Sequence, residues 1–234
     1  MPVEIALHLW SLTANLDEVA RLARHLDAGE TARADRFVYD RHRLAYIVGR
    51  GRLRELLAAK TGMAAGDLRF EYGPQGKPSL PGGPCFNLSH SGGVACLALH
   101  PEMTLGADIE AFRVVEGGVA QRFFAPLEYE TLMALPQAGQ QAGFFRCWTR
   151  KEALIKALGG GLSIPLTAFD VTLDRVAPRL LRLAEPYGDA KAWALAHFEL
   201  GPDMVGAVAA KTNGRPIRIN LASIPDAIPF ATPS

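Results

Sequence analysis

The sequence has little net charge and no long hydrophobic run. Its 25 basic and 24 acidic side chains leave a formal net charge of +1, so no overall field favours nucleic acid or a membrane surface. Apolar runs such as residues 94–99 are too short to span a bilayer. The first ten residues contain no basic segment followed by an apolar core, so we see no secretory signal. We therefore expect neither a membrane nor a nucleic-acid partner.

Cysteine is also scarce. The three cysteines, Cys85, Cys96 and Cys147, lie mostly in apolar surroundings and show no C-x-x-C spacing. An odd, scattered set of this kind indicates free buried thiols in a reducing compartment and argues against a disulfide framework or a zinc site. We therefore predict a cytoplasmic protein.

The residues that are abundant indicate a globular fold. Hydrophobic residues make up 49% of the chain and charged residues 21%, which suits one large domain or two small ones. Alternation of apolar and polar residues predicts a strand at residues 3–10. Further strands of an antiparallel sheet are predicted at residues 169–173, 180–183, 192–198 and 205–210. Beyond residue 215 the spaced prolines predict a loosely ordered tail.

Residues 33–54 are strongly basic, with seven arginines against two acidic residues. Apolar residues recur in this segment at helical spacing, so we predict an amphipathic helix with a cationic side. That side is either a solvated arginine face or an anion site in which guanidinium groups bind phosphate. A nucleic-acid surface is disfavoured because the basic residues are confined to one helix without interleaved aromatic residues.

Two polar segments carry candidate phosphate contacts. Lys77 lies between a glycine and a proline in a turn-rich segment, where it is either solvated or bound to a phosphate. In the segment NLSHSGG (residues 87–93), Ser89, His90, Ser91 and the glycine backbone either cap a turn or bind a phosphate. A catalytic Ser–His pair is disfavoured because neighbouring strand residues point to opposite faces.

The segment LGADIE (residues 105–110) places two carboxylates on one face of a predicted strand. Asp108 and Glu110 repel each other when they lie side by side. A hard divalent cation relieves that repulsion, and Mg²⁺ in particular binds carboxylates and substrate phosphates together. The alternative is a solvated face at the end of a strand.

Residues 145–158 predict a helix that ends at the glycines that follow it. Phe145, Trp148, Glu152 and Lys156 are spaced to share one face. A carboxylate among aromatic rings is unfavourable unless a positive charge compensates it. Glu152 and Lys156 therefore form either an ordinary surface pair or part of a site, to which Glu152 would bring a third carboxylate.

Two features lie ahead of this helix. Phe123 and Phe124 precede Pro126 and an acidic helix start, so they are either a core staple or a hydrophobic docking surface. The segment QAGQQAG (residues 137–143) predicts a polar hinge.

Taken in order, these segments resemble the Sfp-type 4′-phosphopantetheinyl transferases over roughly residues 28–210. Several motifs in one order are far more specific than any of them alone. The matching segments are GKP (76–78), FNLSHS (86–91), LGADIE (105–110), RFFAPLEY (122–129) and, after Phe145, WTRKEALIK (148–156).

The resemblance implies an α+β fold of two similar halves that form a pseudo-dimer. Each half would pack a long helix on a small, mainly antiparallel sheet, and the active site would lie in the cleft between the halves. We expect an N-terminal half at residues 1–104, a C-terminal half at residues 105–215 and the tail at residues 216–234. The family also implies a monomer.

The resemblance further implies an enzyme that uses Mg²⁺. Such an enzyme moves the 4′-phosphopantetheine arm of coenzyme A onto a serine of an acyl or peptidyl carrier protein and releases adenosine 3′,5′-bisphosphate. The carrier, of fatty-acid, polyketide or non-ribosomal-peptide type, would dock near Phe123 and Phe124. By resemblance the metal ligands are Asp108, Glu110 and Glu152. Glu152 would also be the general base, directly or through a metal-bound water.

The resemblance also assigns the contacts to coenzyme A. Lys156 matches the lysine that contacts the pyrophosphate and stabilises the charge of the reaction. The residues that match the group around the 3′-phosphate and adenosine are Lys77, Ser89 and His90. In the early helix, Ala45 stands where the family has an arginine, so Arg43 and Arg50 are expected to replace it.

Two other functions stay open. A Mg²⁺-dependent hydrolase of coenzyme A or of a nucleotide pyrophosphate would use water as the nucleophile and would need no docking surface. A non-catalytic module that binds a carrier protein or coenzyme A would have no need of three carboxylates and Lys156.

Overall fold

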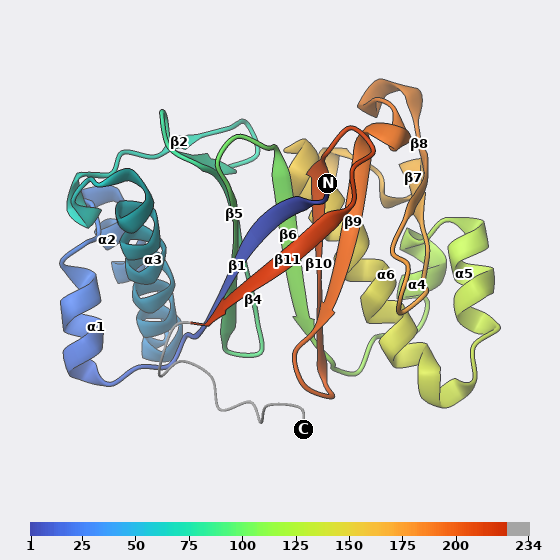
Figure 1. Ribbon diagram of the computed structural model, residues 1–234. Coiled ribbons are helices and arrows are strands. Elements are labelled where there is room, and N and C mark those ends of the chain that lie inside the picture. Colours follow the sequence, from blue (N-terminus) through green and yellow to red (C-terminus); the bar gives the residue numbers. More distant parts are fainter. Residues whose placement is uncertain (224–234) are drawn as a thin grey trace.

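Two β-sheets lie in the middle of the molecule, between helices that cover their outer faces (Figure 1). This computed structural model describes residues 1–223. The first sheet has the strand order β11-β1-β5-β4 and the second has the order β6-β10-β9. Neighbouring strands are antiparallel, except that β11 runs parallel to β1. The bounds are β1 (Val3–Ser11), β4 (Cys85–Ser91), β5 (Val94–His100), β6 (Leu105–Ala111), β9 (Trp193–Glu199), β10 (Met204–Lys211) and β11 (Ile217–Ser223).

Short elements join these strands to the helices. Two-stranded sheets pair β2 with β3 and β7 with β8. Their bounds are β2 (Glu71–Tyr72), β3 (Pro78–Ser79), β7 (Phe169–Val171) and β8 (Leu180–Leu183). The 3₁₀ turns are η1 (Ala65–Asp67), η2 (Gly161–Ser163), η3 (Leu166–Ala168), η4 (Glu185–Tyr187) and η5 (Ala190–Ala192).

The N-terminal helices lie on the outer side of the first sheet. They are α1 (Leu16–Ala23), α2 (Ala28–Asp35) and α3 (Asp40–Thr61). The predicted apolar stripe of α3 packs on this sheet, where Leu53 and Leu57 share a core with Trp10 of β1. The prediction of one helix over residues 33–54 is wrong at its start, because the chain turns between α2 and α3. This turn lets the ring of Phe37 pack against a ring of α3.

The C-terminal helices lie on the outer side of the second sheet. They are α4 (Val119–Phe123), α5 (Pro126–Met133) and α6 (Gln137–Leu158). Helix α6 ends at the predicted glycine, since Gly159 has a φ of 74°, which favours a residue without a side chain. The predicted hinge at residues 137–143 is wrong, because Gln and Ala favour a helix and the segment forms the start of α6. A buried ion pair of 2.8 Å between Lys151 and Glu128 joins α6 to α5.

Three hydrophobic cores hold these layers together. One lies between α3 and the first sheet, and another lies between α6 and the second sheet. The third lies between the two sheets, with side chains from β1 and β5 on one side and from β6 and β10 on the other. The sheets also meet at their edges, where β4 lies beside β6 and β11 lies beside β9. The predicted α+β fold with two helix-covered, mainly antiparallel sheets is confirmed.

The C-terminal segment differs from the predicted tail at residues 216–234. Residues 217–223 form β11, because Ile217 and Ile219 alternate with polar residues and pack on the core between the sheets. The tail prediction is therefore wrong for this strand, and residues 224–234 lie outside the described residues. The expected boundary at residues 104–105 falls between β5 and β6, although β11 returns to the first sheet.

Two further observations concern the described part of the chain. All three cysteines are unpaired there, and Cys96 and Cys147 are buried, as the sequence predicts. Between residues 1 and 223, no helix has both the length and the apolar character that a membrane crossing requires.

Candidate active site

The predicted carboxylates lie where β6 packs directly against α6. Gly106 allows this contact, because a side chain at this position would overlap the backbone of Ala153 and Ala157 in α6. Asp108 and Glu110 lie on the same face of β6 as Gly106. Glu152 and Lys156 lie one turn apart on α6. The close approach of helix and strand therefore gathers four of the predicted site residues.

Asp108 is buried, with 5% of its surface exposed. Its Oδ1 atom accepts hydrogen bonds from the Ser89 hydroxyl at 2.8 Å and from the Lys156 amine at 2.6 Å. Its Oδ2 atom has no hydrogen-bond partner within residues 1–223. Burial raises the pKa of Asp108, and the nearby Lys156 amine opposes that rise. The alternative of a surface pair between Glu152 and Lys156 is not what the structure contains, because Lys156 pairs with Asp108.

The other two carboxylates have different surroundings. Glu110 accepts hydrogen bonds from the Ser91 hydroxyl at 2.8 Å and from Arg113 at 2.6 Å. Glu152 is half-buried and has no hydrogen bond or ion pair to any residue of the described chain. Burial raises the pKa of Glu152, and so do the negative charges of Asp108 and Glu110. The site therefore carries more negative charge than its own cations balance.

The chemistry of these donors suits a hard divalent cation, although their present arrangement does not bring three of them together. Carboxylate oxygens are the ligands that Mg²⁺ prefers, and one oxygen of Asp108 together with the Glu152 carboxylate has no partner in residues 1–223. Within residues 1–223, no three acidic, histidine or cysteine side chains lie close enough together to bind a metal ion as they stand. Instead, Lys156 and Arg113 balance the charge of Asp108 and Glu110.

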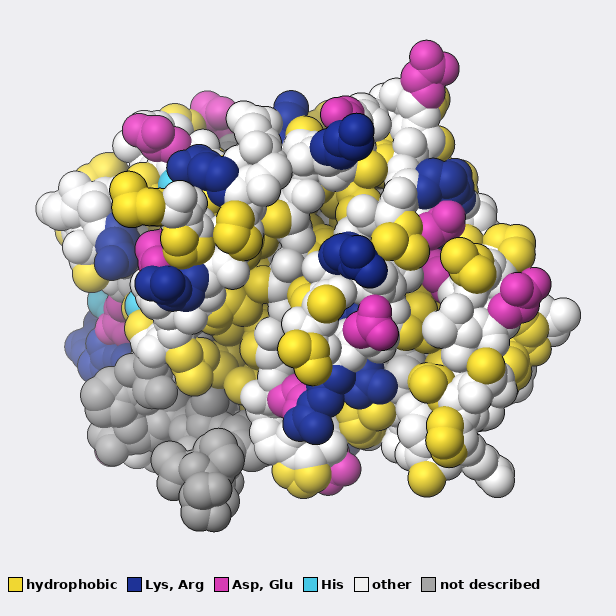
Figure 2. Space-filling view, turned by 45° about the vertical axis from the view of Figure 1, so that its right-hand side comes forward, with side chains coloured by type: hydrophobic (Ala, Val, Ile, Leu, Met, Phe, Trp, Pro, Cys, Tyr) yellow, Lys and Arg dark blue, Asp and Glu magenta, His cyan; other side chains and the backbone are white. Residues whose placement is uncertain are grey.

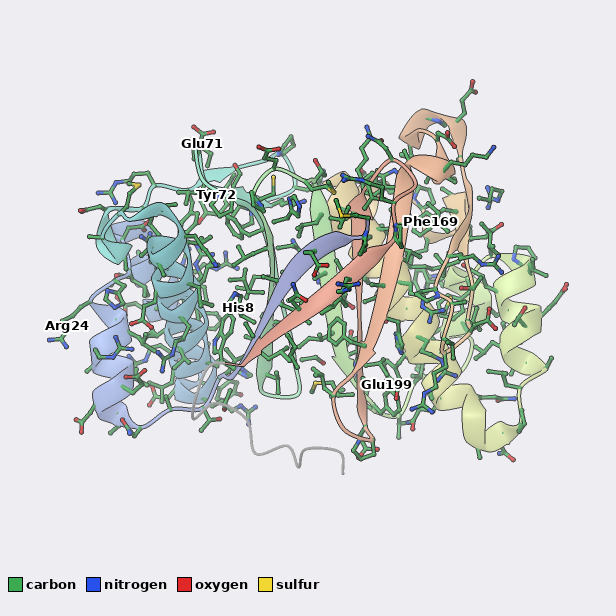
Figure 3. All side chains as sticks on the ribbon, viewed as in Figure 1. His8, Arg24, Glu71, Tyr72, Phe169 and Glu199 are labelled. Carbon is green, nitrogen blue, oxygen red and sulfur yellow. The ribbon has the colours of Figure 1, made fainter. Side chains whose placement is uncertain are left out.

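A cavity of about 970 Å³ lies beside β4, between this strand and helices α2 and α3. Adjacent residues of β4 face the two regions, because Ser89 contacts Asp108 whereas His90 is exposed and lines the cavity. Tyr72 of β2 also lines the cavity, and Figure 3 shows it above α3. The basic residues that line the cavity are Arg33, Arg41, His42, Arg50 and His90.

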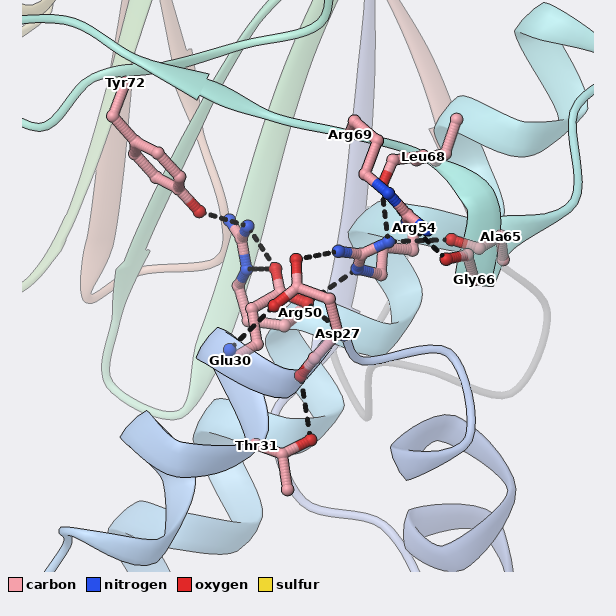
Figure 4. Close-up of polar contacts among 10 residues, drawn as sticks. All are labelled: Asp27, Glu30, Thr31, Arg50, Arg54, Ala65, Gly66, Leu68, Arg69 and Tyr72. Atoms are coloured by element: carbon pink, nitrogen blue, oxygen red, sulfur yellow. Dashed lines mark hydrogen bonds and ion pairs between the residues drawn. The ribbon is translucent and has the colours of Figure 1, made fainter.

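Arg50 borders the cavity, but its charge is already paired (Figure 4). Its guanidinium donates to Glu30, which is buried and also accepts from Arg54. Arg50 donates a further hydrogen bond of 3.2 Å to the hydroxyl of Tyr72. This network fixes Arg50 at the cavity wall and neutralises much of its charge.

Of the two arginines that the sequence selected, Arg50 lines the cavity and Arg43 does not. Arg43 is not among the lining residues and forms an ion pair of 3.1 Å with Asp40. Arg33 and Arg41 do line the cavity and are exposed. The sequence marked both as members of the basic segment, but helical periodicity could not select them because the helix is interrupted between them.

Lys77 and Ser89 have partners within the protein. The Lys77 amine donates to the carbonyl oxygens of Leu105 at 3.0 Å and Ala157 at 3.4 Å, so it joins the loop before β3 to β6 and α6. Burial lowers the pKa of Lys77. Ser89 is buried between Asp108 and Lys156, as described above.

The expected docking pair is divided between core and surface. Phe124 is 2% exposed and stacks on Phe144, so its ring is not available to a partner. Phe123 is partly buried against Trp148. On the face where the C-terminal half comes forward, hydrophobic side chains form several separate groups among charged ones (Figure 2). Leu127 of α5 is an exposed hydrophobic residue near Phe123 in the chain.

Comparison with known proteins covers most of the chain. Residues 104–209 match the family model of the 4′-phosphopantetheinyl transferase superfamily, and residues 10–102 match the model of the N-terminal part of 4′-phosphopantetheinyl transferases. The 4′-phosphopantetheinyl transferase HetI of Nostoc sp. is 38% identical over 214 residues, which cover 87% of this chain and 86% of that protein. The 4′-phosphopantetheinyl transferase Sfp of Bacillus subtilis is 31% identical over 79% of this chain and 80% of its own length.

A more distant relative and one solved structure are also similar. The human L-aminoadipate-semialdehyde dehydrogenase-phosphopantetheinyl transferase is 30% identical over 72% of this chain and 58% of its own length. The ACPS–CoA complex of Chronobacterium ammoniagenes superposes on 47% of this chain and 96% of that chain with 19% identity and a TM-score of 0.37, a similarity too low to support an argument. On the family models and the full-length relatives, the chain belongs to the 4′-phosphopantetheinyl transferase superfamily.

Proposed function

We propose that this protein transfers the 4′-phosphopantetheine arm of coenzyme A to a serine of an acyl or peptidyl carrier protein and requires Mg²⁺. The observation that carries the proposal is the position of β4 between two regions. His90 and other residues of the strand line a basic cavity, and Ser89 beside them contacts a buried carboxylate–lysine pair. A substrate with phosphates at both ends of its nucleotide part suits such a pair of regions.

The cavity would take the nucleotide end of coenzyme A. Arg33 and Arg41 are exposed cations of its lining, and His90 faces them from β4. We assign the 3′-phosphate to these three residues. We give Arg50 a supporting role because Glu30 already pairs with it. Lys77 and Ser89, which the resemblance matches to the same group, would act by holding β6 and α6 in place, since their polar atoms are engaged there.

The pyrophosphate would lie toward Lys156. Asp108, Glu110 and Glu152 would hold Mg²⁺, which when bound neutralises phosphate charge. In the reaction, the carrier serine oxygen forms a bond to the β-phosphorus, and the bond from that phosphorus to the bridging oxygen breaks. Lys156 stabilises the charge that develops on the phosphate oxygens. The leaving group is adenosine 3′,5′-bisphosphate.

The proton of the serine hydroxyl must be removed as the new bond forms. The Glu152 carboxylate has no hydrogen bond within the described residues and lies one helical turn from Lys156, so it would act as the base, directly or through a metal-bound water. No serine of this chain needs activation, because the nucleophile comes from the carrier protein.

The remaining assignments concern the whole protein. We propose that the carrier docks near Phe123, over the exposed side chains of α4 and α5, with Phe124 supporting this surface from below. We also propose that residues 1–104 and 105–215 are the two halves of a cytoplasmic monomer, because one chain supplies both the cavity and the carboxylate site.

Intact-mass spectrometry of an apo carrier protein incubated with this chain, coenzyme A and Mg²⁺ tests the proposal. We expect a gain of one phosphopantetheine, which EDTA and the substitution Asp108→Ala both abolish. Consumption of coenzyme A without a mass gain on several carrier types would indicate the pyrophosphate hydrolase instead. Binding of coenzyme A without its consumption would indicate a non-catalytic module.

A further inference from the structure

The two sheets meet along β4 and β6 through side chains and not through paired backbones. Both strands lie at the edge of their sheets. Three β4 residues on one face, at every second position, accept hydrogen bonds from every second backbone N–H group of β6. Asn87 accepts from the Ala107 N–H at 2.9 Å, Ser89 accepts from the Ile109 N–H at 3.4 Å, and Ser91 accepts from the Ala111 N–H at 3.0 Å. We call this row of three side chains the β4 ladder.

The two serines of the β4 ladder also contact the proposed metal ligands. The Ser89 hydroxyl donates to Asp108 at 2.8 Å, and the Ser91 hydroxyl donates to Glu110 at 2.8 Å. A serine hydroxyl has one proton and two lone pairs. Because each hydroxyl accepts from a β6 N–H group, its proton is directed to the neighbouring carboxylate. The ladder therefore sets the orientation of both hydroxyls before any ligand binds.

Ser91 has the clearer role of the two. Glu110 has two partners, Ser91 and Arg113, and they differ in rigidity. Arg113 is an exposed side chain beyond the end of β6, whereas Ser91 is held on a strand by the Ala111 N–H group. If Arg113 moves away when a cation binds, Ser91 still holds one carboxylate oxygen of Glu110. Without the hydroxyl, Arg113 alone would direct this carboxylate.

We propose that Ser91 is a positioning residue that orients Glu110 for the divalent cation, as Ser89 does for Asp108. The inference rests on the proposed function, because that function assigns Asp108 and Glu110 as metal ligands. Hydrogen-bond partners of metal ligands commonly change metal affinity by about 10–100-fold when they are removed. Ser91 also borders the cavity, so its effect on the metal must be separated from any effect on coenzyme A.

Two matched substitutions test this role. Ser91→Thr keeps the hydroxyl, whereas Ser91→Val has nearly the same shape without it. Mn²⁺ binding to the whole protein is measured by electron paramagnetic resonance with coenzyme A present, and coenzyme A binding is measured by calorimetry without metal. We expect Ser91→Val to weaken Mn²⁺ binding about tenfold and Ser91→Thr to stay within about threefold of the original protein. Coenzyme A binding without metal should not change.

Other outcomes would overturn the proposal. If Ser91→Val lowers only the unfolding temperature and leaves Mn²⁺ affinity unchanged, Ser91 merely joins the two sheets. If Ser91→Val does not fold, Ser91→Ala is measured in its place, and unchanged Mn²⁺ affinity again contradicts the role. Ser79→Ala, an exposed serine of β3, is the control and should change neither quantity. These measurements need no carrier protein, so a failure of transfer and a failure of positioning are distinguished.

Discussion

At the scale of single residues, the cavity and the ion pairs divide the arginines of the N-terminal half into different roles. Arg33 and Arg41 line the cavity, Arg50 lines it but is paired with Glu30, and Arg43 lies outside the lining with Asp40. A cation that binds phosphate must present donors that no carboxylate already occupies. The structure therefore favours the first two for coenzyme A.

Kinetics with coenzyme A as the varied substrate can test this division. We expect Arg33→Ala and Arg41→Ala each to raise KM for coenzyme A about tenfold, the size of one lost charged hydrogen bond, with kcat nearly unchanged. The effect should shrink as salt is added, because the side chains are exposed. Arg43→Ala is the control, because it removes the same charge from α3, the helix of Arg41, at a position outside the cavity lining. A larger rise in KM for Arg43→Ala than for the other two would contradict the division.

The proposed role of Glu152 in activity would come at the expense of stability. Burial and neighbouring carboxylates raise the pKa of Glu152 in the folded protein. The folded protein therefore holds this proton more tightly than the unfolded chain, so stability from this group is lost as pH rises above the ordinary glutamate value of about 4.3. Glu152→Gln removes the ionised form.

We expect Glu152→Gln to raise the unfolding temperature in EDTA by roughly 2–4 °C at pH 8 and by little near pH 4. The same substitution should abolish transfer. Differential scanning fluorimetry against pH measures the first effect, and mass spectrometry of the carrier measures the second. A variant that is less stable than the original protein at pH 8 would show that Glu152 is stabilised by contacts in the folded protein instead.

At the scale of elements, the site depends on how closely α6 approaches β6. Gly106 sits at the point of contact with the backbone of α6. We expect Gly106→Ala to lower the free energy of unfolding by about 1–3 kcal/mol, as overpacking does, and to reduce kcat because Lys156 and Asp108 are moved apart. Gly139→Ala adds the same methyl group to α6 where nothing lies within 4 Å. This control should leave stability equal or slightly higher, by up to about 1 kcal/mol.

Urea unfolding and steady-state kinetics of the two glycine variants are the measurements. Equal effects of both substitutions would show that the close contact at Gly106 is not responsible.

The sequence predicted the elements that carry the chemistry better than it predicted their neighbours. Residues 105–110 and the helix at residues 145–158 follow local periodicity, so their faces could be worked out, and α6 does bring Lys156 to Asp108. The hydrogen bonds between Ser89 and β6 could not be predicted, because they depend on which two sheet edges meet. The same is true of Phe124, whose neighbours alone decide whether a phenylalanine is core or surface.

At the scale of the whole molecule, the two halves share structure that neither could complete alone. The core between the sheets takes side chains from both, and β11 brings the C-terminal segment back to the first sheet. A half of the chain on its own would expose one wall of this core to water. We therefore do not expect the two predicted halves to be independent folding units.

Unfolding should consequently be a single transition. In a Trp148→Phe, Trp193→Phe protein, the remaining Trp10 lies buried in the N-terminal half, so its fluorescence reports on that half alone. We expect its urea transition to coincide with that of far-ultraviolet circular dichroism, which reports on both halves. Ile219→Asn in β11 places a polar group against the shared core and should lower the free energy of unfolding by about 2 kcal/mol. The urea midpoints of both signals should therefore fall together. Arg218→Asn changes the exposed neighbour and is the control. If the Trp10 transition moved alone, the halves would be separate folding units, and the carboxylate site would not depend on β11.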